Sequence, residues 1–232
     1  MDSQRLRTTG PANRPSNLWN KALTDRFGQV ESPARERTRQ PVLEGQRVLT
    51  VGHSFHVFVA DILCDIARRA GIAGHVAGGK QFLGGSRVIE HWNRPDSCNE
   101  AKRVLRSGRV DVLTLSPTFH PDEGIDRFAR LGLEHNPELR VTIQASWVPF
   151  DGLLAATIYP GKGGRDALTG TELRELHAPY FQSLNEEVTS LNKDYGKPVL
   201  SVVPVGQALI ALRERGQLGQ FFCSGSIEAH CK

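Results

Sequence analysis

The sequence predicts an α/β fold in which a mainly parallel sheet is covered by helices on both faces. Short apolar runs rich in Val, Ile and Leu are nearly continuous, as expected of strands that are buried on both faces. Segments with helical periodicity lie between them, and this alternation is typical of a parallel sheet. The apolar runs are Val48–Val51, Val110–Leu115, Val141–Ala145 and Val199–Val203.

The helical segments are identified by apolar residues at three- and four-residue steps. The helix after the first run is expected to face the core with Ile62, Leu63, Ile66, Ala67 and Ala70, and Cys64 among them is expected to be a small core residue. Further helices are expected around residues 125–133 and 205–212.

The longest helical pattern should begin at a capping box, because Thr169 is followed three residues later by Glu172. Pro179 lies inside the pattern and should kink or split the helix, since proline has no N–H to donate. Residues 151–170 are Gly-rich and aperiodic, and are expected to form a long loop or lid-like insertion. The apolar positions of this helix are Leu173, Leu176, Tyr180, Leu184, Val188 and Leu191.

The chain length of 232 residues suits one globular domain with tails. Residues 1–45 are rich in Arg, Pro, Ser, Thr and Asn and are expected to be a disordered lead-in. Residues 46–220 are expected to form the domain. Residues 221–232 would be a short tail, either the natural end or the product of a truncated reading frame.

Composition argues against several classes of protein. The net charge is +4, but the excess comes largely from scattered arginines near the N-terminus, so nucleic-acid binding is not expected. No run approaches the roughly 18 apolar residues of a membrane span, and no secretory signal is visible. A cytoplasmic location is therefore expected by default, unless the start site is misassigned. Cys223, His230 and Cys231 match no standard zinc spacing, so neither a metal nor a cofactor is expected.

The most informative motif is Gly52-His53-Ser54-Phe55-His56, directly after the first apolar run. A serine at the turn between a buried strand and a helix has an exposed hydroxyl and a backbone N–H free to bind an oxyanion. Serine hydrolases present their nucleophile in this way. The alternative is that Ser54 only caps the following helix.

A second motif is Gly84-Gly85-Ser86, followed by His91-Trp92. A glycine pair brings a backbone N–H close to a ligand without obstruction by side chains. The alternative is an ordinary turn. His91 beside Trp92 is expected to pack under the active-site loop and support Gly85.

With both motifs in this order, the chain resembles the SGNH (GDSL-like) hydrolases over about residues 47–215. The resemblance implies a flavodoxin-like three-layer α/β/α sandwich and ester hydrolysis through a serine nucleophile. Ser54 would attack the ester, and the N–H groups of Ser54 and Gly85 would bind the oxyanion. The family also suggests a small acyl group, such as an acetyl on a carbohydrate.

The sequence departs from the family pattern at the site. The residue before the serine is His53, where the family usually has Asp. No Asn follows the strand that ends at Leu115; Ser116 or Thr118 either donates a hydroxyl there or is a turn residue. His56 either reaches the mouth of the site or is a polar residue at the start of the helix.

The general base is where the sequence departs furthest from the family pattern. The family ends in an Asp-x-x-His-like block, but the late histidine here is His230, and Glu228 or a backbone carbonyl would have to orient it. The alternative is that His230 is a surface residue near a chain end. His120, which follows the apolar run Val110–Leu115, is the substitute base.

Three functions remain. The first is a serine esterase in which Ser54 and His230 act on a small-molecule or carbohydrate ester. The second is a catalytically inactive relative that binds a carbohydrate or another partner through the same pocket. The third, a phosphate-binding protein, is disfavoured because Gly161-Lys162-Gly163-Gly164 lacks the strand and helix of a P-loop. The sequence does not indicate an oligomeric state.

Overall fold

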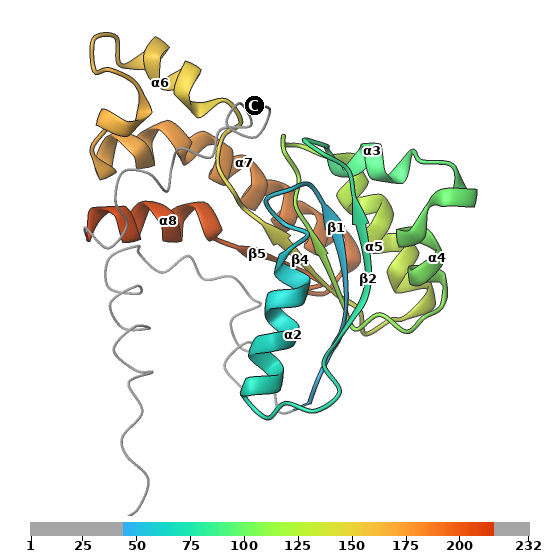
Figure 1. Cartoon of the computed structure of the whole chain (residues 1–232). Coiled ribbons are helices and arrows are strands. Elements are labelled where there is room, and N and C mark those ends of the chain that lie inside the picture. The colour runs from blue at the N-terminus through green and yellow to red at the C-terminus, as the bar shows by residue number, and fades with distance from the viewer. Residues whose placement is uncertain (1–43, 216–232) are drawn as a thin grey trace, which may run out of the picture. The chain divides into compact units, whose positions relative to one another are not determined.

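The computed structural model describes residues 44–215 (Figure 1). They belong to the second of the two units into which the chain divides, Gln40–Lys232. Residues 1–43 of the expected lead-in and the whole expected tail, with His230, lie outside the described residues.

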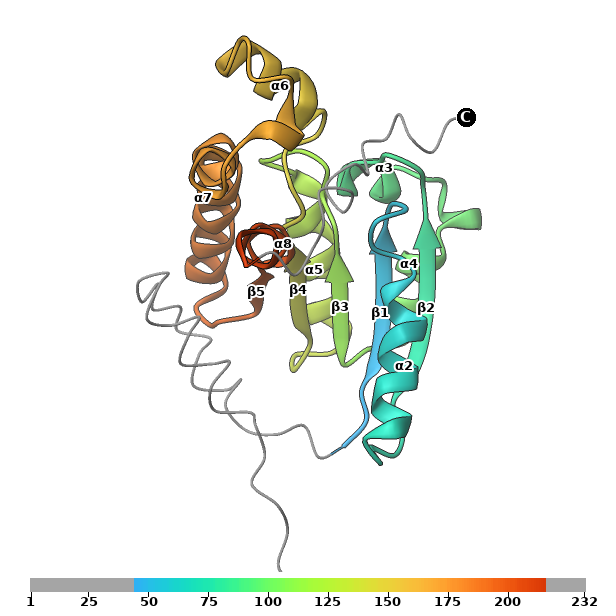
Figure 2. The same ribbon diagram turned by 60° about the vertical axis from the view of Figure 1, so that its left-hand side comes forward.

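Within the described residues, five parallel strands form one sheet in the order β2-β1-β3-β4-β5 (Figure 2). This is the strand order of flavodoxin-like folds, so the α/β fold with a parallel sheet is confirmed. The strands are β1 (Arg47–Gly52), β2 (Val76–Phe82), β3 (Val112–Leu115), β4 (Arg140–Gln144) and β5 (Leu200–Val203).

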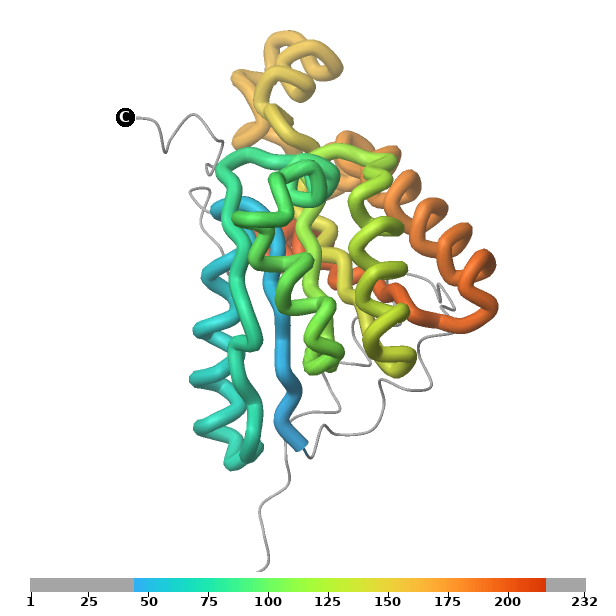
Figure 3. The backbone as a smooth tube through the Cα atoms, turned by 90° about the vertical axis from the view of Figure 1, so that its right-hand side faces the viewer, coloured from blue at the N-terminus to red at the C-terminus, as the bar shows by residue number. Residues whose placement is uncertain are grey.

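Helices cover both faces of the sheet. Helices α2 and α8 lie over one face, and α3, α4, α5 and α7 lie over the other (Figures 2 and 3). The helices are α2 (Val59–Arg69), α3 (Val88–Trp92), α4 (Glu100–Arg106), α5 (Glu123–His135), α6 (Asp151–Ile158), α7 (Gly170–Tyr195) and α8 (Val205–Glu214), with short 3₁₀ helices η3 (Asp96–Cys98) and η4 (Arg165–Ala167).

The four apolar runs predicted as strands are β1, β3, β4 and β5, and these predictions are confirmed. Their side chains form the main core together with those of α5 and α7. Strand β2 was not predicted, because Gly78 and Gly79 interrupt its pattern and most of its residues are exposed. It is the edge strand and is held by backbone pairing to β1 rather than by burial of its side chains.

The long helix α7 differs from the prediction in one respect. The capping box is present, since Thr169 Oγ1 accepts from the Glu172 N–H and the Glu172 carboxylate accepts from the Thr169 N–H. Pro179, however, neither splits nor ends the helix. It lies on the exposed side, where the carbonyl that loses its partner can bind water instead.

The expected loop over residues 151–170 is wrong in part. It contains α6 and η4, and the glycine-rich stretch between them and residues 168–169 are irregular. Helix α6 was missed because its eight residues are almost uniformly apolar and therefore show no helical period.

Helix α2 forms where predicted, but its large apolar residues do not face the sheet. Ala60 and Ala67 are its buried residues, whereas Ile62, Leu63 and Ile66 are exposed. Cys64, expected in the core, is half-buried. The periodicity identified an apolar stripe correctly and assigned it to the wrong surface.

No helix among residues 44–215 is both long enough and apolar enough to cross a bilayer.

Candidate active site

The residues singled out by the sequence gather at the carboxyl ends of the strands, where parallel sheets bind their ligands. Ser54 follows β1, Gly85 follows β2, and Ser116 and Thr118 follow β3. The first two loops touch, because the Leu83 N–H donates to the carbonyl of the β1 end at 3.2 Å.

Ser54 lies in an exposed turn that precedes α2. The turn is closed by N–H groups of His56 and Val57, which both donate to the His53 carbonyl. The N-cap of α2 is Phe58, so Ser54 does not cap this helix. Neither the hydroxyl nor the N–H of Ser54 has a hydrogen-bond partner within residues 44–215.

His53 supports this turn from inside. Its Nδ1 accepts from the Phe55 N–H at 3.3 Å, and its Nε2 lies 3.1 Å from Ser116 Oγ. Burial, with a smaller contribution from His56, lowers the pKa of His53 to about 4, so the ring is neutral at pH 7. A neutral ring that accepts at Nδ1 carries its proton on Nε2, and therefore donates to the buried Ser116 hydroxyl.

His56 ties the same turn to β3 and β4. Its Nδ1 lies 2.9 Å from Gln144 Oε1, an acceptor, so Nδ1 carries the proton, and Nε2 accepts from the Thr114 hydroxyl at 3.1 Å. Gln144 in turn donates to the Phe55 carbonyl at 3.1 Å. The ring is buried, and burial lowers the pKa of His56. Both ring nitrogens are thus used beneath the turn.

Gly85 is exposed with a φ of +61°, in the left-handed region that glycine adopts without strain. Its N–H, like that of Ser54, has no acceptor in the described part of the chain. A Cβ at this position would meet no atom within 4 Å, so space above the residue is open.

The turn that contains Gly85 is held by a buried polar network. His91 Nε2 lies 2.8 Å from Ser86 Oγ, which donates to the Leu83 carbonyl at 2.8 Å. Thr118 Oγ1 donates to the Ser86 carbonyl at 2.6 Å. Burial, followed by Arg94 and His53, lowers the pKa of His91 to about 4, so this support is also neutral. Thr118 and His91 therefore fix the position of the exposed turn.

His120, the expected substitute base, is buried, whereas Ser54 and Gly85 are exposed. Its side chain is 1% exposed, its ring lies 4.6 Å from that of Tyr180, and Nδ1 is 3.5 Å from the Glu187 carboxylate.

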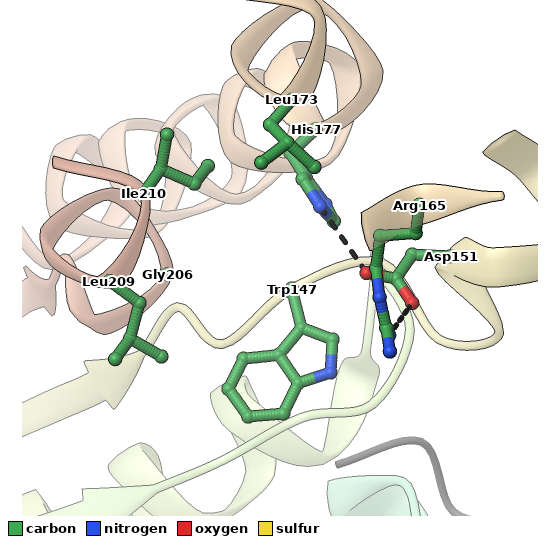
Figure 4. Close-up of a pocket in the computed structure, with 8 residues that line it drawn as sticks. All are labelled: Trp147, Asp151, Arg165, Leu173, His177, Gly206, Leu209 and Ile210. Carbon is green, nitrogen blue, oxygen red and sulfur yellow. Dashed lines mark hydrogen bonds and ion pairs between the residues drawn. The ribbon is translucent and has the colours of Figure 1, made fainter. Parts of the chain in front are cut away.

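A pocket lies at the ends of β4 and β5 (Figure 4). Trp147, which follows β4, forms one wall, and its ring packs against Phe55 with 5.0 Å between centroids. The apolar walls come from α7 and α8 and include Leu173, Leu209 and Ile210. One wall residue of the pocket, Trp147, therefore contacts the residue that follows Ser54.

The polar wall of this pocket is a buried group of charged residues. Arg165 forms an ion pair with Asp151, and His177 Nε2 lies 3.6 Å from the same carboxylate. His177 Nδ1 accepts from the Val148 N–H at 3.1 Å. Burial, and then Arg165, lowers the pKa of His177 to about 4; burial raises the pKa of Asp151, although Arg165 opposes this.

Sequence reasoning missed these pocket residues. Asp151 and Arg165 lie in the segment expected to be an aperiodic loop and His177 lies in the long helical pattern, and only the packing of α6, η4 and α7 brings the three together. One signal was available for Trp147, which follows a strand end as Ser54 does. Across residues 44–215, no three His, Cys, Asp or Glu side chains are arranged to hold a metal ion.

No protein-family model matches the chain, and no curated protein compared with it matches. A solved structure similar to it is that of a candidate GDSL-like lipase from Parabacteroides merdae ATCC 43184. The identity is 12% and the TM-score 0.39, over 77% of this chain and 100% of the other.

Proposed function

We propose that the protein is a serine ester hydrolase of the SGNH type with Ser54 as its nucleophile. One observation carries the proposal. Ser54 offers an exposed hydroxyl and an unpaired N–H at the end of β1, and Gly85 offers a second unpaired N–H at the end of the neighbouring strand. Two backbone donors beside a serine are what a tetrahedral acyl-transfer intermediate requires.

The reaction follows from these roles. A general base takes the proton of Ser54 Oγ as the oxygen attacks the ester carbonyl, and the two N–H groups stabilise the oxyanion. The alcohol leaves with a proton, and water then hydrolyses the acyl-enzyme to release the acid. His230 is the proposed base. His53 and His56 are unsuited to this role, because the ring nitrogens of both are engaged beneath the turn.

The pocket beside Trp147 supports a small acyl group. Its charged residues are paired with one another, so the surface left for a ligand is largely that of Leu173, Leu209, Ile210 and the indole. A short apolar group fits such a wall better than an anion, which would compete with Asp151 for Arg165. The proposal of an acetyl ester on a carbohydrate rests on the resemblance to the family.

A second candidate is a catalytically inactive protein that binds a carbohydrate or other partner through the same pocket. The residues that follow β3 favour this candidate. The hydroxyl of Ser116 is engaged with His53 and that of Thr118 with the Ser86 carbonyl, so neither is directed to a ligand as the family's Asn would be.

The test is hydrolysis of p-nitrophenyl acetate and labelling by a fluorophosphonate probe. We expect both with the full chain, and neither with Ser54→Ala, because the hydroxyl is the attacking group; loss of a nucleophile lowers turnover by several orders of magnitude. Ser190→Ala is the matched control, since Ser190 is exposed on α7 and distant in the fold. It should keep full activity and labelling.

Each outcome separates the two candidates. Hydrolysis and labelling that disappear only in Ser54→Ala support the esterase. Labelling that persists in Ser54→Ala excludes Ser54 as the nucleophile. A wild-type chain that is folded but neither hydrolyses the ester nor takes the label contradicts the esterase and favours the inactive binding protein.

A further inference from the structure

The exposed phenylalanines among residues 44–215 all belong to the carboxyl-terminal edge of the sheet. Each of them ends a strand or lies in the segment after it, so that β1, β2, β3 and β4 contribute one each. Ser54 and Gly85 lie at the same edge, because the strands are parallel. This aromatic rim consists of Phe58, Phe82, Phe119 and Phe150, which are 47–54% exposed.

Phe82 is held next to both turns of the candidate site. It pairs with Gly52 across β2 and β1, two residues before Ser54. A Cβ on Gly84 would lie 3.8 Å from Phe82 Cζ, so the ring lies along the backbone of the residue before Gly85. An ester bound between the two turns would therefore have this ring beside it.

The segment that carries Phe119 is tied to the same site from the other side. It follows β3, which flanks β1 opposite β2. Thr118, the residue before Phe119, donates its hydroxyl to the carbonyl of Ser86, and Ser86 follows Gly85. The two strands that flank β1 thus each contribute one phenylalanine, and the nucleophile Ser54 follows β1 itself.

The strand-end segments that carry these residues have no charged side chain. No Lys, Arg, Asp or Glu occurs in residues 52–58, 82–86, 116–121, 145–150 and 203–205. Apart from that of Ser54, the hydroxyl and imidazole side chains in these segments are buried. Arg87, which follows the second segment, donates to the Pro121 carbonyl and lies 3.7 Å from the Asp122 carboxylate.

This composition favours an apolar ligand over a sugar. The hydroxyl groups of a sugar would lose hydrogen bonds to water at such a surface, and the segments offer few side chains to replace them. A hydrocarbon group loses nothing of this kind and gains from burial against the aromatic rings.

We propose that the protein hydrolyses esters of apolar alcohols, and that Phe82 and Phe119 determine this specificity by contacting the hydrocarbon part of the alcohol. The inference rests on the proposed esterase and its small acyl group, which leaves the alcohol as the part that meets the rim. The alcohol is then a hydrocarbon rather than the carbohydrate that the family resemblance implies. With hexyl acetate, attack by Ser54 breaks the bond between the acyl carbon and the alkoxy oxygen, hexanol leaves with a proton, and water releases acetate from the acyl-enzyme.

Four esters test the specificity of the full chain, each used below its solubility limit. Hexyl acetate and ethyl acetate have leaving alcohols of similar reactivity, and kcat/KM should be about fifteenfold higher for hexyl acetate, as half-burial of the additional methylene groups supplies. Ethyl hexanoate is an isomer of hexyl acetate with the chain on the acyl side, and it should be hydrolysed no faster than ethyl acetate. 6-O-acetylglucose, with a sugar in place of the chain, should likewise be a poor substrate.

Substitutions on the rim test the two phenylalanines. Phe82→Ser and Phe119→Ser should each lower the ratio of kcat/KM for hexyl acetate to that for ethyl acetate by about fourfold, because each removes part of the apolar surface. Val76→Ser is the matched control: Val76 is 46% exposed at the opposite end of β2, and the ratio should not change. Circular dichroism confirms that each variant is folded.

The outcomes separate this inference from the esterase itself. A chain that hydrolyses p-nitrophenyl acetate but does not prefer hexyl acetate to ethyl acetate overturns the inference and leaves the esterase in place. A preference for ethyl hexanoate or 6-O-acetylglucose does the same. A preference for hexyl acetate that arises only above its solubility limit also overturns the inference, and indicates binding to a lipid surface instead.

A chain without esterase activity is tested by saturation-transfer NMR with 1-hexanol. Saturation of hexanol by the wild-type chain that Phe82→Ser abolishes supports the apolar alcohol site and contradicts only the esterase. Absence of saturation in the wild-type chain overturns the apolar alcohol site as well.

Discussion

At the scale of single residues, burial lowers the pKa of four histidines of the described chain, and His56 is one of them. His53 and His91 lie under the two turns of the candidate site, and His177 lies in the wall of the pocket. The pKa of each of these three is lowered to about 4. Both nitrogens of each ring contact a polar group: a neutral hydrogen-bond partner or, in His177, the Asp151 carboxylate. Protonation of the ring would therefore disrupt these contacts.

The stability of the protein should therefore fall as the pH falls from 6.5 towards 4. In this window the unfolded chain binds protons at these histidines and the folded chain does not, so acid favours unfolding. The contribution of each histidine is on the order of 1–3 kcal/mol, fully present above pH 6.5. Urea denaturation at a series of pH values measures this slope.

His91→Gln isolates one of these histidines. The variant should unfold with a shallower dependence on pH than the wild type, whatever its absolute stability. His135→Gln replaces an exposed histidine and should keep the wild-type slope. Equal slopes in all three proteins would contradict the assignment of His91 as a neutral buried support.

At the scale of elements, sequence patterns predicted the helices and strands that depend on interactions between residues close together in the chain. The capping box of α7 was visible because its two residues interact with each other's backbone within one turn. The buried strands were visible because central strands of a parallel sheet need apolar residues on both faces. Strand β2 and the outward face of α2 were not, because each depends on which neighbour lies beside it.

Thr169→Ala should lower the free energy of unfolding by about 1 kcal/mol, because the Glu172 N–H loses its acceptor at the helix start. Thr171→Ala is the control: Thr171 is exposed two residues after Thr169 and takes no part in the cap, so its effect should be small. Denaturant unfolding of the three proteins measures the difference. Equal losses for the two variants would argue against a stabilising role of the cap.

At the scale of the whole molecule, the pocket depends on how closely α8 approaches the end of β4. Gly206 makes that approach possible, since its N–H donates to the Ala145 carbonyl at 2.8 Å. A Cβ on Gly206 would lie far inside contact distance of the Ser146 carbonyl oxygen, at 1.7 Å. The position of α8, and with it one wall of the pocket, is set by the absence of a side chain.

Gly206→Ala should therefore destabilise the protein by about 3 kcal/mol, because backbone must move to relieve the clash. Gly152→Ala is the matched control near the start of α6: its Cβ would meet nothing within 4 Å, and alanine favours the helix. Thermal unfolding should show a large loss for the first variant and little change or a gain for the second. A tolerated Gly206→Ala would contradict the close packing of α8 on β4.

The sequence by itself determined the parallel α/β fold, four of the five described strands and the placing of Ser54 past a strand end. These follow from periodicity and from the geometry of parallel sheets, which act over a few residues at a time. Only the tertiary structure decided that Asp151, Arg165 and His177 meet beside Trp147, and that the stripe of α2 faces outward. Both depend on contacts between residues distant in the chain, and no local pattern specifies which surfaces come together.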